Sequence, residues 1–352
     1  MLDSVLVFDY PHDKLEIIVV DDSTDGTTQL LQSYREKHPE LITIVHRERR
    51  DGFKAGALQT ALDRSRGDLF VLFDADHVPA PDFLKRMVPY LCSDSRVALA
   101  QPRQGYLHDV NSWVARALGL GTDAYAFVDQ EARYSAELLT HFSGSGGVFR
   151  KAAVVDVGGW SSDTLAEDLD MSIRLRLRGW RWVYDRSIEC PGELPDSFTI
   201  LRQQQFRWAS GFAGCLSKYL RKLLTTNRMS IMQKGEAMIY LSGYVASPLI
   251  AIGVVVAILY CLVFPSDFIL DGFRHNVLST FTVVMSALIY TAPLAMFAVA
   301  VYRSTNGWPR RIRRVSDLFY LGVLSVGIFL TSARAVVSGL LNRATYFYKT
   351  PR

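Results

Sequence analysis

Four groups of polar residues in this 352-residue chain have types and spacings that could do chemistry together. Paired carboxylates can hold a divalent cation that carries a diphosphate, and a carboxylate facing a cleft can act as a general base. An arginine can bind a diphosphate while a neighbouring indole shapes a sugar site. The groups are Asp21-Asp22, Asp74-Ala75-Asp76, Glu167-Asp168 and Gln204-Gln205-Phe206-Arg207-Trp208.

Each group also has a purely structural interpretation. An Asp-x-Asp can be a solvated turn, Asp21-Asp22 can cap a helix or turn, and acids in the first turn of a helix are stabilised by its dipole. Aromatic residues on an amphipathic helix are usually core residues or membrane-interface anchors. Lys54, between Gly52 and Gly56, is either a helix-start lysine in water or a residue beside a closely approaching ligand. Taken singly, these groups leave both interpretations open.

Short apolar runs alternate with helical patterns through residues 1–236, which predicts an α/β domain with a mostly parallel sheet. In such sheets ligands bind beyond the carboxyl ends of the strands. Asp21-Asp22 and Asp74-Ala75-Asp76 both follow predicted strands. The predicted strands are Leu15–Val20, Leu41–His46, Asp68–Phe73 and Arg96–Gln101, and the helices are Gly26–Lys37, Lys54–Ser65, Pro81–Cys92, Leu165–Arg178 and Phe198–Leu224.

Composition narrows the class of protein. Hydrophobic residues make up 49% and charged residues 21%, which excludes a disordered chain. The 39 basic and 35 acidic residues leave 39 − 35 = +4, which gives no support to nucleic-acid binding. The four cysteines are widely spaced without a CxxC pair, so we expect neither a disulfide framework nor a zinc site, and we assume a reducing compartment.

The C-terminal third contains long uncharged runs. Residues 237–266 and 276–302 are each long enough to cross a bilayer core, which needs about 20 helical residues. A third run, Leu318–Ala333, ends at Arg334 and favours an interfacial or re-entrant helix. The loop Arg303–Asp317 carries five arginines, so the positive-inside rule places it, and residues 1–236, in the cytoplasm. We therefore expect a multi-pass protein of the inner or plasma membrane.

The four groups together resemble the processive family 2 glycosyltransferases, in the cellulose synthase and mannan (glucomannan) synthase-like branch. Their order and spacing match that family, and the resemblance runs over the whole chain. Local matches are Val20-Asp21-Asp22-Ser23-Thr24-Asp25, Gly52-Phe53-Lys54-Ala55-Gly56-Ala57-Leu58, Gly158-Gly159-Trp160 and Gly192-Glu193-Leu194-Pro195. The resemblance implies a GT-A-like nucleotide-sugar-binding domain followed by interfacial and transmembrane helices.

The resemblance also implies roles for individual residues. Asp168 would be the catalytic base, in a motif where Ala166 replaces the family's threonine, and Asp76 would hold Mg²⁺ or Mn²⁺. Donor contacts would come from Asp22, Lys54, Asp74, Gln204, Arg207 and Trp208. Acceptor contacts would come from Phe142, Ser143, Gly144 and Trp208, and a gating segment would use Thr350 and Arg352.

The implied reaction is an inverting transfer of a hexose from a nucleotide-diphosphate sugar to a growing β-linked polysaccharide. UDP-glucose and GDP-mannose are the expected donors, and UDP-N-acetylglucosamine stays open. The partners would be the donor, a glycan or lipid acceptor and membrane lipid, without nucleic acid. The alternatives are a non-processive enzyme that forms a glycolipid, like ceramide glucosyltransferases, and an inactive fragment that acts as a membrane partner.

One departure concerns the N-terminus. Family members begin with a transmembrane helix and a first strand, whereas this chain starts after that point, so we expect a central strand and part of the nucleotide site to be absent. The expected divisions are a truncated catalytic domain (1–197), amphipathic interfacial helices (198–236), transmembrane or interfacial helices (237–341) and the gating-like segment (342–352).

Overall fold

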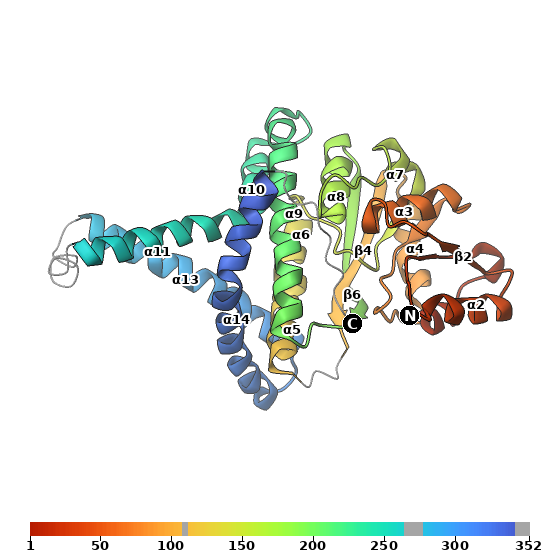
Figure 1. Cartoon of the computed structure of the whole chain (residues 1–352), viewed down its shortest axis with the longest axis horizontal. Helices are drawn as coiled ribbons and strands as arrows, with labels where there is room; N and C mark the ends of the chain where they lie inside the picture. Colours follow the sequence, from red (N-terminus) through yellow and green to blue (C-terminus); the bar gives the residue numbers. More distant parts are fainter. Residues whose placement is uncertain (108–111, 264–276, 342–352) are drawn as a thin grey trace.

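The computed structural model describes residues 1–107, 112–263 and 277–341. Figure 1 shows an α/β body followed by long helices. The strands are β1 (Ile17–Asp21), β2 (Ile42–His46), β3 (Leu69–Val71), β4 (Val97–Tyr106), β5 (Val148–Arg150) and β6 (Arg181–Gly192). The strands and helices expected from the sequence are confirmed, with small shifts at their ends except for β4, which continues to Tyr106.

Helices connect these strands. In the α/β body they are α1 (Leu2–Leu6), α2 (Thr27–Lys37), α3 (Phe53–Arg64), α4 (Phe83–Ser93), α5 (Trp113–Ala124), α6 (Glu131–Ser135), α7 (Lys151–Asp156) and α8 (Glu167–Arg178), with a 3₁₀ turn η1 (His12–Lys14) and a π-helical segment η2 (Tyr125–Gln130). The C-terminal helices are α9 (Phe198–Thr225), α10 (Ile231–Leu241), the 3₁₀ turn η3 (Gly243–Val245), α11 (Ala246–Val263), α13 (Val277–Ser304) and α14 (Trp308–Leu340).

The described strands form two sheets. β1 and β2 are parallel, and the second sheet has the order β3-β5-β4-β6. β4 and β6 are parallel, but β5 is antiparallel to both β3 and β4, so the sheet is mixed, with β3, β4 and β6 running in one direction. Three residues are too few for β5 to give a recognisable pattern in the sequence. It nevertheless places β3 and β4 in the same direction, so Asp74 still follows a carboxyl end.

Packing joins the two sheets. Among the described residues no ladder connects β1 to β3. At their amino ends, the Glu16 carboxylate accepts hydrogen bonds from the backbone N–H groups of Arg66 (2.6 Å) and Gly67 (3.1 Å). Ile17 and Ile42 also share one apolar core with Phe83. Among the described residues, the two sheets are therefore joined by side-chain contacts rather than by backbone pairing.

A second apolar core supports the loop between α6 and β5. The ring of Phe149 is fully buried and contacts Phe70 (centroids 5.4 Å apart), Phe142 (4.9 Å) and Trp160 (5.8 Å). Such aromatic contacts contribute both buried area and a preferred ring geometry. The loop at residues 140–147 therefore lies on a rigid base.

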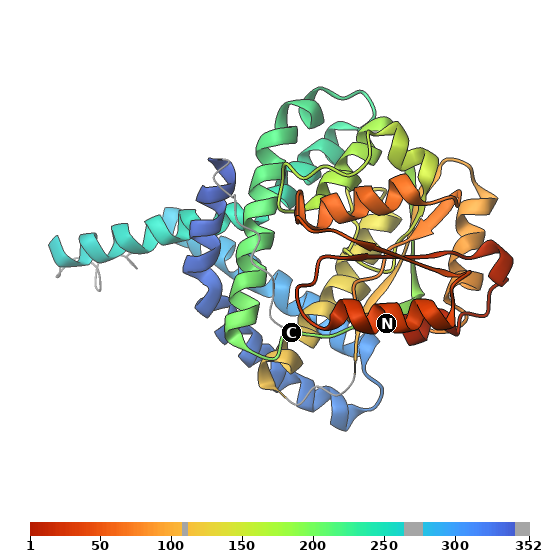
Figure 2. The ribbon, with the colours of Figure 1, turned by 45° about the vertical axis from the view of Figure 1, so that its right-hand side comes forward.

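The last helix returns to the α/β body. α14 packs along α9 and α5. The buried Asp317 on α14 accepts a hydrogen bond from Arg116 Nη2 on α5 (2.7 Å), and Arg314 pairs with Asp123. By contrast, α11 projects away from the body in Figures 1 and 2. α14 is thus tied to α5 by buried ion pairs.

Within the described ranges, one helix, α14, is long enough and apolar enough to span a membrane. α10 and residues 243–256 pass the same test as a pair bent by 46°. The third apolar run, predicted to be an interfacial or re-entrant helix, thus forms part of the longest continuous helix among the described residues. The bend in the first run falls between α10 and η3, a few residues before Pro248.

Candidate active site

The ammonium group of Lys54 lies at the centre of the candidate site. Its Nζ is 2.8 Å from Asp74 Oδ1 and 3.8 Å from Glu167 Oε1, and it donates to the carbonyl oxygen of Gly144 (3.0 Å). These partners come from the turn after β3, the start of α8 and the loop 140–147. One cation therefore gathers three segments that are far apart in the sequence.

The loop 140–147 carries Gly144 into this site. A side chain at Gly144 would begin 3.6 Å from Asp168 Oδ2 and 3.8 Å from Lys54 Nζ, and the backbone there has φ +90°. Glycine is suited to both the close approach and the left-handed conformation. The next residue, Ser145, accepts a hydrogen bond at Oγ from the backbone N–H of Asp74 (3.1 Å). The loop thus contacts both the predicted base and the Asp-x-Asp turn.

Burial controls the charge of the two acids at the start of α8. It raises the pKa of Glu167 to about 7, helped by the neighbouring Asp168, while Lys54 opposes the rise. Burial also raises the pKa of Asp168, against Lys54 and Arg207. For Lys54, burial alone would lower the pKa, but Asp74 and Glu167 outweigh it and the pKa rises. Lys54 therefore stays charged, and a carboxyl with a raised pKa is a better proton acceptor.

Three side chains after β3 could hold a metal ion. One ligand atom each from Asp74, Asp76 and His77 lie within 4.8 Å of one another. His77 Nδ1 is 3.2 Å from Asp76 Oδ1, and its other nitrogen is 2.7 Å from Gln104 Nε2, which fixes the ring. Carboxylate oxygens suit Mg²⁺ and Mn²⁺, and an imidazole is a common ligand of transition metals. The donor set therefore fits a divalent ion.

α9 brings the arginine motif to the same site. The charge of Arg207 acts on the pKa values of both Glu167 and Asp168, so the guanidinium lies near both acids. α9 is fixed to α8 by the fully buried Asp170, which accepts from Lys218 Nζ and Tyr219 Oη, both at 2.6 Å. Trp208 is 41% exposed, so its ring is open to a ligand. Gln204 lies one turn before Trp208 on the same helix.

Asp21 and Asp22 have different surroundings. Asp21 is buried and accepts hydrogen bonds from Ser23 and Thr28, which hold its pKa well below the usual range although burial opposes this. Asp22 faces Arg47, whose Nε and Nη2 lie 2.7 Å and 2.6 Å from its two oxygens. Asp21 is therefore structural, and Asp22 is the one more open to a ligand.

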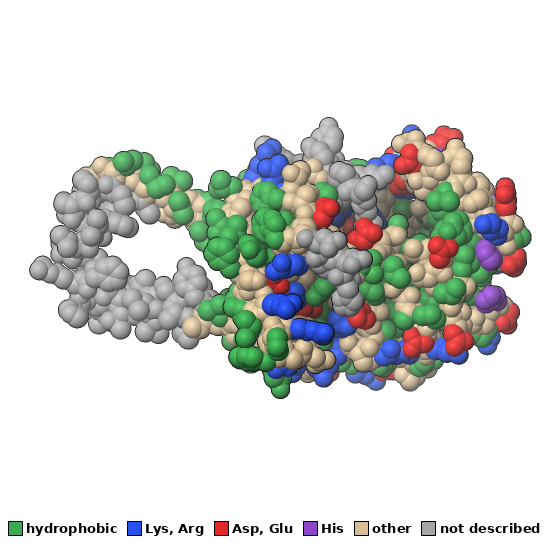
Figure 3. All heavy atoms as spheres, turned by 90° about the horizontal axis from the view of Figure 1, so that it is seen from below, with side chains coloured by type: hydrophobic (Ala, Val, Ile, Leu, Met, Phe, Trp, Pro, Cys, Tyr) green, Lys and Arg blue, Asp and Glu red, His purple; other side chains and the backbone are tan. Residues whose placement is uncertain are grey.

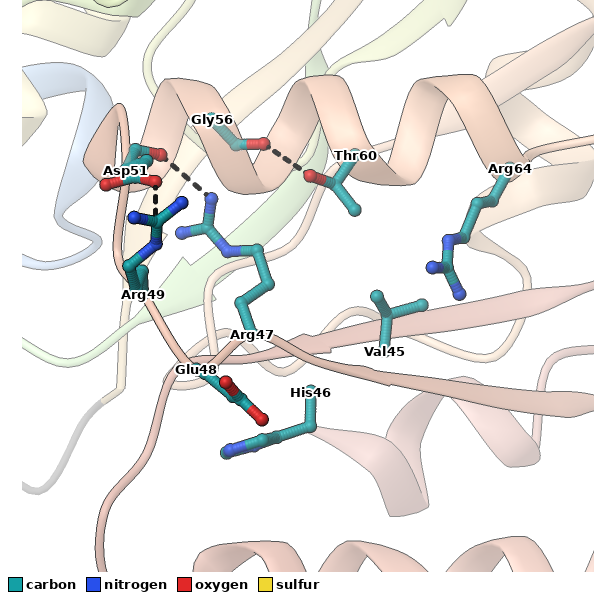
Figure 4. Close-up of a pocket in the computed structure, with 9 residues that line it drawn as sticks. All are labelled: Val45, His46, Arg47, Glu48, Arg49, Asp51, Gly56, Thr60 and Arg64. Atoms are coloured by element: carbon teal, nitrogen blue, oxygen red, sulfur yellow. Dashed lines mark hydrogen bonds and ion pairs between the residues drawn. The ribbon is translucent and has the colours of Figure 1, made fainter.

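Arg47 also borders a hollow of about 480 Å³ between α3 and the end of β2 (Figure 4). Its lining includes Gly56, where a Cβ would collide with the carbonyl oxygen of Asp51. The second glycine of the Gly-Phe-Lys-Ala-Gly motif is thus required by this backbone contact rather than by a ligand. Because residues 54 and 56 point about 200° apart on a helix, this hollow is separate from the Lys54 cluster.

The remaining predicted site residues differ in outcome. Phe142 was expected to contact the acceptor, but its side chain is 1% exposed and packs on Phe149, so it supports the loop from beneath. Gly144 is on the site side of the same loop, whereas the Ser143 hydroxyl lies 3.3 Å from that of Tyr125. Thr350 and Arg352 lie outside the described residues. Sequence reasoning missed His77, although it directly follows the Asp-x-Asp motif.

Comparisons with known proteins give consistent matches. Residues 1–211 match the family described as "Glycosyltransferase like family 2". Glucomannan 4-beta-mannosyltransferase 1 from Oryza sativa subsp. japonica is 34% identical over 272 residues, which are 75% of this chain and 52% of that protein. Glucomannan 4-beta-mannosyltransferase 7 from Arabidopsis thaliana is 30% identical over 338 residues, 94% of this chain and 57% of that protein. The chain spans about half the length of the curated relatives it matches.

Among solved structures, a mannosyltransferase from Pyrobaculum calidifontis in complex with GDP-Man and Mn²⁺ is similar with a TM-score of 0.62. The identity is 22%, and the match covers 97% of this chain and 82% of that one. At this identity the likeness concerns the fold.

The pKa of Glu167 predicts a pH dependence of stability. The carboxyl has its ordinary value of 4.5 when unfolded and about 7 when folded, so the native state binds more protons between these values and loses stability as the pH rises. Glu167→Gln removes this pH-dependent loss of stability. Between pH 4 and 8, the free energy of unfolding of the variant should rise by up to about 3 kcal/mol relative to that of the wild type.

Chemical denaturation of the purified chain in detergent with EDTA measures this difference. Glu36→Gln, which removes an exposed carboxylate on α2, is the control and should follow the wild-type trend. A Glu167→Gln curve parallel to the wild type across this range would contradict the assignment.

Proposed function

Because the chain belongs to the glycosyltransferase-like family 2 and has a GT-A-like glycosyltransferase fold, we propose that it transfers a hexose from a nucleotide-diphosphate sugar to a growing β-linked polysaccharide. The family and fold expected from the sequence are confirmed by these matches. The observation that carries the proposal is the Lys54 cluster, which joins Asp74, Glu167 and the Gly144 loop beside Asp168.

Asp168 is the proposed general base. Its buried carboxylate accepts the proton of an acceptor hydroxyl as that oxygen attacks C1 of the donor sugar. Lys54 and Arg207, whose charges both act on Asp168, offset the negative charge that grows on the departing diphosphate. One base and no covalent intermediate make this a single displacement with inversion at C1.

GDP-mannose is the proposed donor, ahead of UDP-glucose. The support is that the relatives at 30–34% identity are named as glucomannan mannosyltransferases. Asp22, Lys54 and Asp74 would contact the donor, with Gln204, Arg207 and Trp208 on its diphosphate and at the acceptor end. Ser143 and Gly144 would line the acceptor, and Phe142 would support them from the core.

A divalent ion is the proposed cofactor. Asp74, Asp76 and His77 would hold it, and His77 favours Mn²⁺ over Mg²⁺ because imidazole is a softer ligand than oxygen. When bound, the ion would neutralise charge on the diphosphate of the donor. Lys54 contacts only Oδ1 of Asp74, so the other oxygen of Asp74 would be offered to the ion beside Asp76 and His77.

A multi-pass membrane location with the catalytic part in the cytoplasm is also proposed. Side chains described on α11 include Ile252, Leu262 and Val263, which are 61–74% exposed. On α14 the exposed stripe Trp308, Ile312, Val315 and Phe319 faces away from α5 and α9. Figure 3 shows hydrophobic side chains beside Lys and Arg at the base of the projecting helices. This pattern supports α14 at the membrane surface and α11 within the bilayer.

Replacing the proposed base tests the reaction. Asp168→Asn keeps the size of the side chain but cannot take the proton, so transfer should fall at least a hundredfold while donor binding is kept. Purified membranes are given labelled GDP-mannose, UDP-glucose or UDP-N-acetylglucosamine, and the incorporated label is measured. Calorimetry measures the binding of GDP and UDP. Asp156→Asn, which changes an aspartate of α7 away from the site, is the matched control.

A labelled polymer or ladder of oligosaccharides supports polysaccharide synthesis. A single labelled glycolipid would instead support the lipid acceptor. Transfer unchanged in Asp168→Asn would remove this residue from its role, and no transfer by the wild type from any of the three donors would contradict the proposed function.

Replacing His77 tests the metal site. His77→Ala should weaken Mn²⁺ binding roughly tenfold, because one of three ligands is lost. Electron paramagnetic resonance of free Mn²⁺ measures this binding without turnover, and EDTA treatment should abolish transfer by the wild type. His12→Ala, an exposed histidine in η1, should bind Mn²⁺ like the wild type. Equal affinity in both variants would exclude His77 as a ligand.

Membrane extraction tests the location. An alkaline carbonate wash removes peripheral proteins from membranes. The chain should stay in the membrane pellet, because its apolar helices would be held within the bilayer. Protease added to the cytoplasmic face should cleave within residues 1–236. Release by carbonate, or protection of residues 1–236 from that face, would contradict the proposal.

A further inference from the structure

A buried polar network lies behind the loop 140–147, and the proposed chemistry does not use it. The half-buried ring of His141 lies between Tyr125 of η2, Phe212 of α9 and Tyr240 of α10. His141 Nδ1 is hydrogen-bonded to the hydroxyl of Tyr240. Its Nε2 lies 3.4 Å from the hydroxyl of Tyr125, which in turn lies 3.3 Å from Ser143 Oγ. The network therefore leads from α10 to the loop.

Tyr240 is held in place from its other side. The guanidinium of Arg133 lies over the ring, with Cζ 3.7 Å from the centroid, and Arg133 also pairs with Glu236 one turn earlier on α10. Two contacts at 3.0 Å to Asp129 fix Arg133 itself. A cation over an aromatic face and a buried ion pair both resist displacement. The hydroxyl of Tyr240 is thus aimed at His141 by its surroundings.

On the loop side, each residue after His141 is attached to the site. The backbone N–H of Phe142 donates to Ser172 Oγ (2.8 Å), and that hydroxyl donates to the carbonyl oxygen of Asp168 (2.7 Å). The N–H of Ser143 donates to the buried Gln101 (3.2 Å), and Gly144 accepts from Lys54. A displacement of His141 would therefore move the loop segment that faces Asp168.

A proton relay is the competing role for these groups. Burial lowers the pKa of His141 to about 4, so the imidazole is neutral and a poor proton acceptor near neutral pH. A neutral ring with both nitrogens in contact with tyrosine hydroxyls is instead suited to a fixed orientation. The π-helical η2 places Tyr125 there, and such segments are frequent at functional sites.

We propose that Tyr240 and His141 are positioning residues that couple α10 to the acceptor side of the site, by holding Ser143 and Gly144 next to Asp168. This inference rests on the proposed function for the identity of the acceptor. α10 leads through η3 into the apolar α11. The position of the membrane-directed helices thus sets the geometry in which the acceptor hydroxyl meets its base.

The test is Tyr240→Phe, which removes one hydroxyl and keeps the ring under Arg133. The acceptor KM of the full chain, measured with mannose oligosaccharides, should rise roughly fivefold, because one buried hydrogen bond is lost. The donor KM should stay within twofold of the wild type. The matched control is Tyr244→Phe, since Tyr244 also makes an edge-to-face contact with Phe212 but its hydroxyl bonds Gln205 of α9.

Hydrogen exchange gives a readout that does not need turnover. The amides of residues 142–146 should exchange faster in Tyr240→Phe than in the wild type and Tyr244→Phe, while those of β4 and β6 are unchanged. Unchanged exchange in the loop, or an equal rise in donor and acceptor KM, would overturn the coupling. If the wild type transfers no hexose, the proposed function fails while the exchange comparison still decides the coupling.

A pair of histidine variants keeps the test open if Tyr240→Phe folds poorly. The amide of asparagine reaches the position of Nδ1, and that of glutamine reaches Nε2. His141→Asn should therefore keep the bond to Tyr240 and lose less acceptor affinity than His141→Gln. The reverse order would assign the positioning to Tyr125 instead and overturn the role of Tyr240.

Discussion

The architecture of the site depends on one positive charge. Three carboxylates, those of Asp74, Glu167 and Asp168, act on the half-buried ammonium group of Lys54, and without it they would repel one another. An ammonium group has three donors and needs several partners when buried. That requirement explains why it binds the carbonyl oxygen of Gly144 as well as acids. Lys54 thus brings the proposed donor and acceptor sides of the site together.

Separate elements hold the two sides, and buried polar contacts fix each element. The proposed donor side uses the turn after β3, while the proposed acceptor side uses the loop 140–147. The proposed base and the arginine motif are on α8 and α9, which Asp170 joins through Lys218 and Tyr219. A buried charge with fewer partners would cost several kcal/mol. These contacts therefore set geometry more than they add stability.

Local patterns in the sequence predicted the strands, the acids at their ends and the family, because period and motif spacing are short-range signals. They could not show that Phe142 turns inward, since that depends on its ring contact with Phe149 in the folded core. β5 was missed because three residues carry no period. The partners of His141 come from Tyr125 and Tyr240, 16 and 99 residues away, and only the folded chain brings them together.

The separation of the sheets has a mechanical consequence. Asp22 follows β1 and Asp74 follows β3, yet among the described strands no backbone ladder ties one to the other. The Glu16 contacts hold the opposite ends together. The distance between Asp22 and Asp74 therefore depends on side-chain contacts rather than on a backbone ladder. Arg47 supplies part of this link, because it binds both Asp22 and the carbonyl oxygen of Phe53, next to the Lys54 that contacts Asp74.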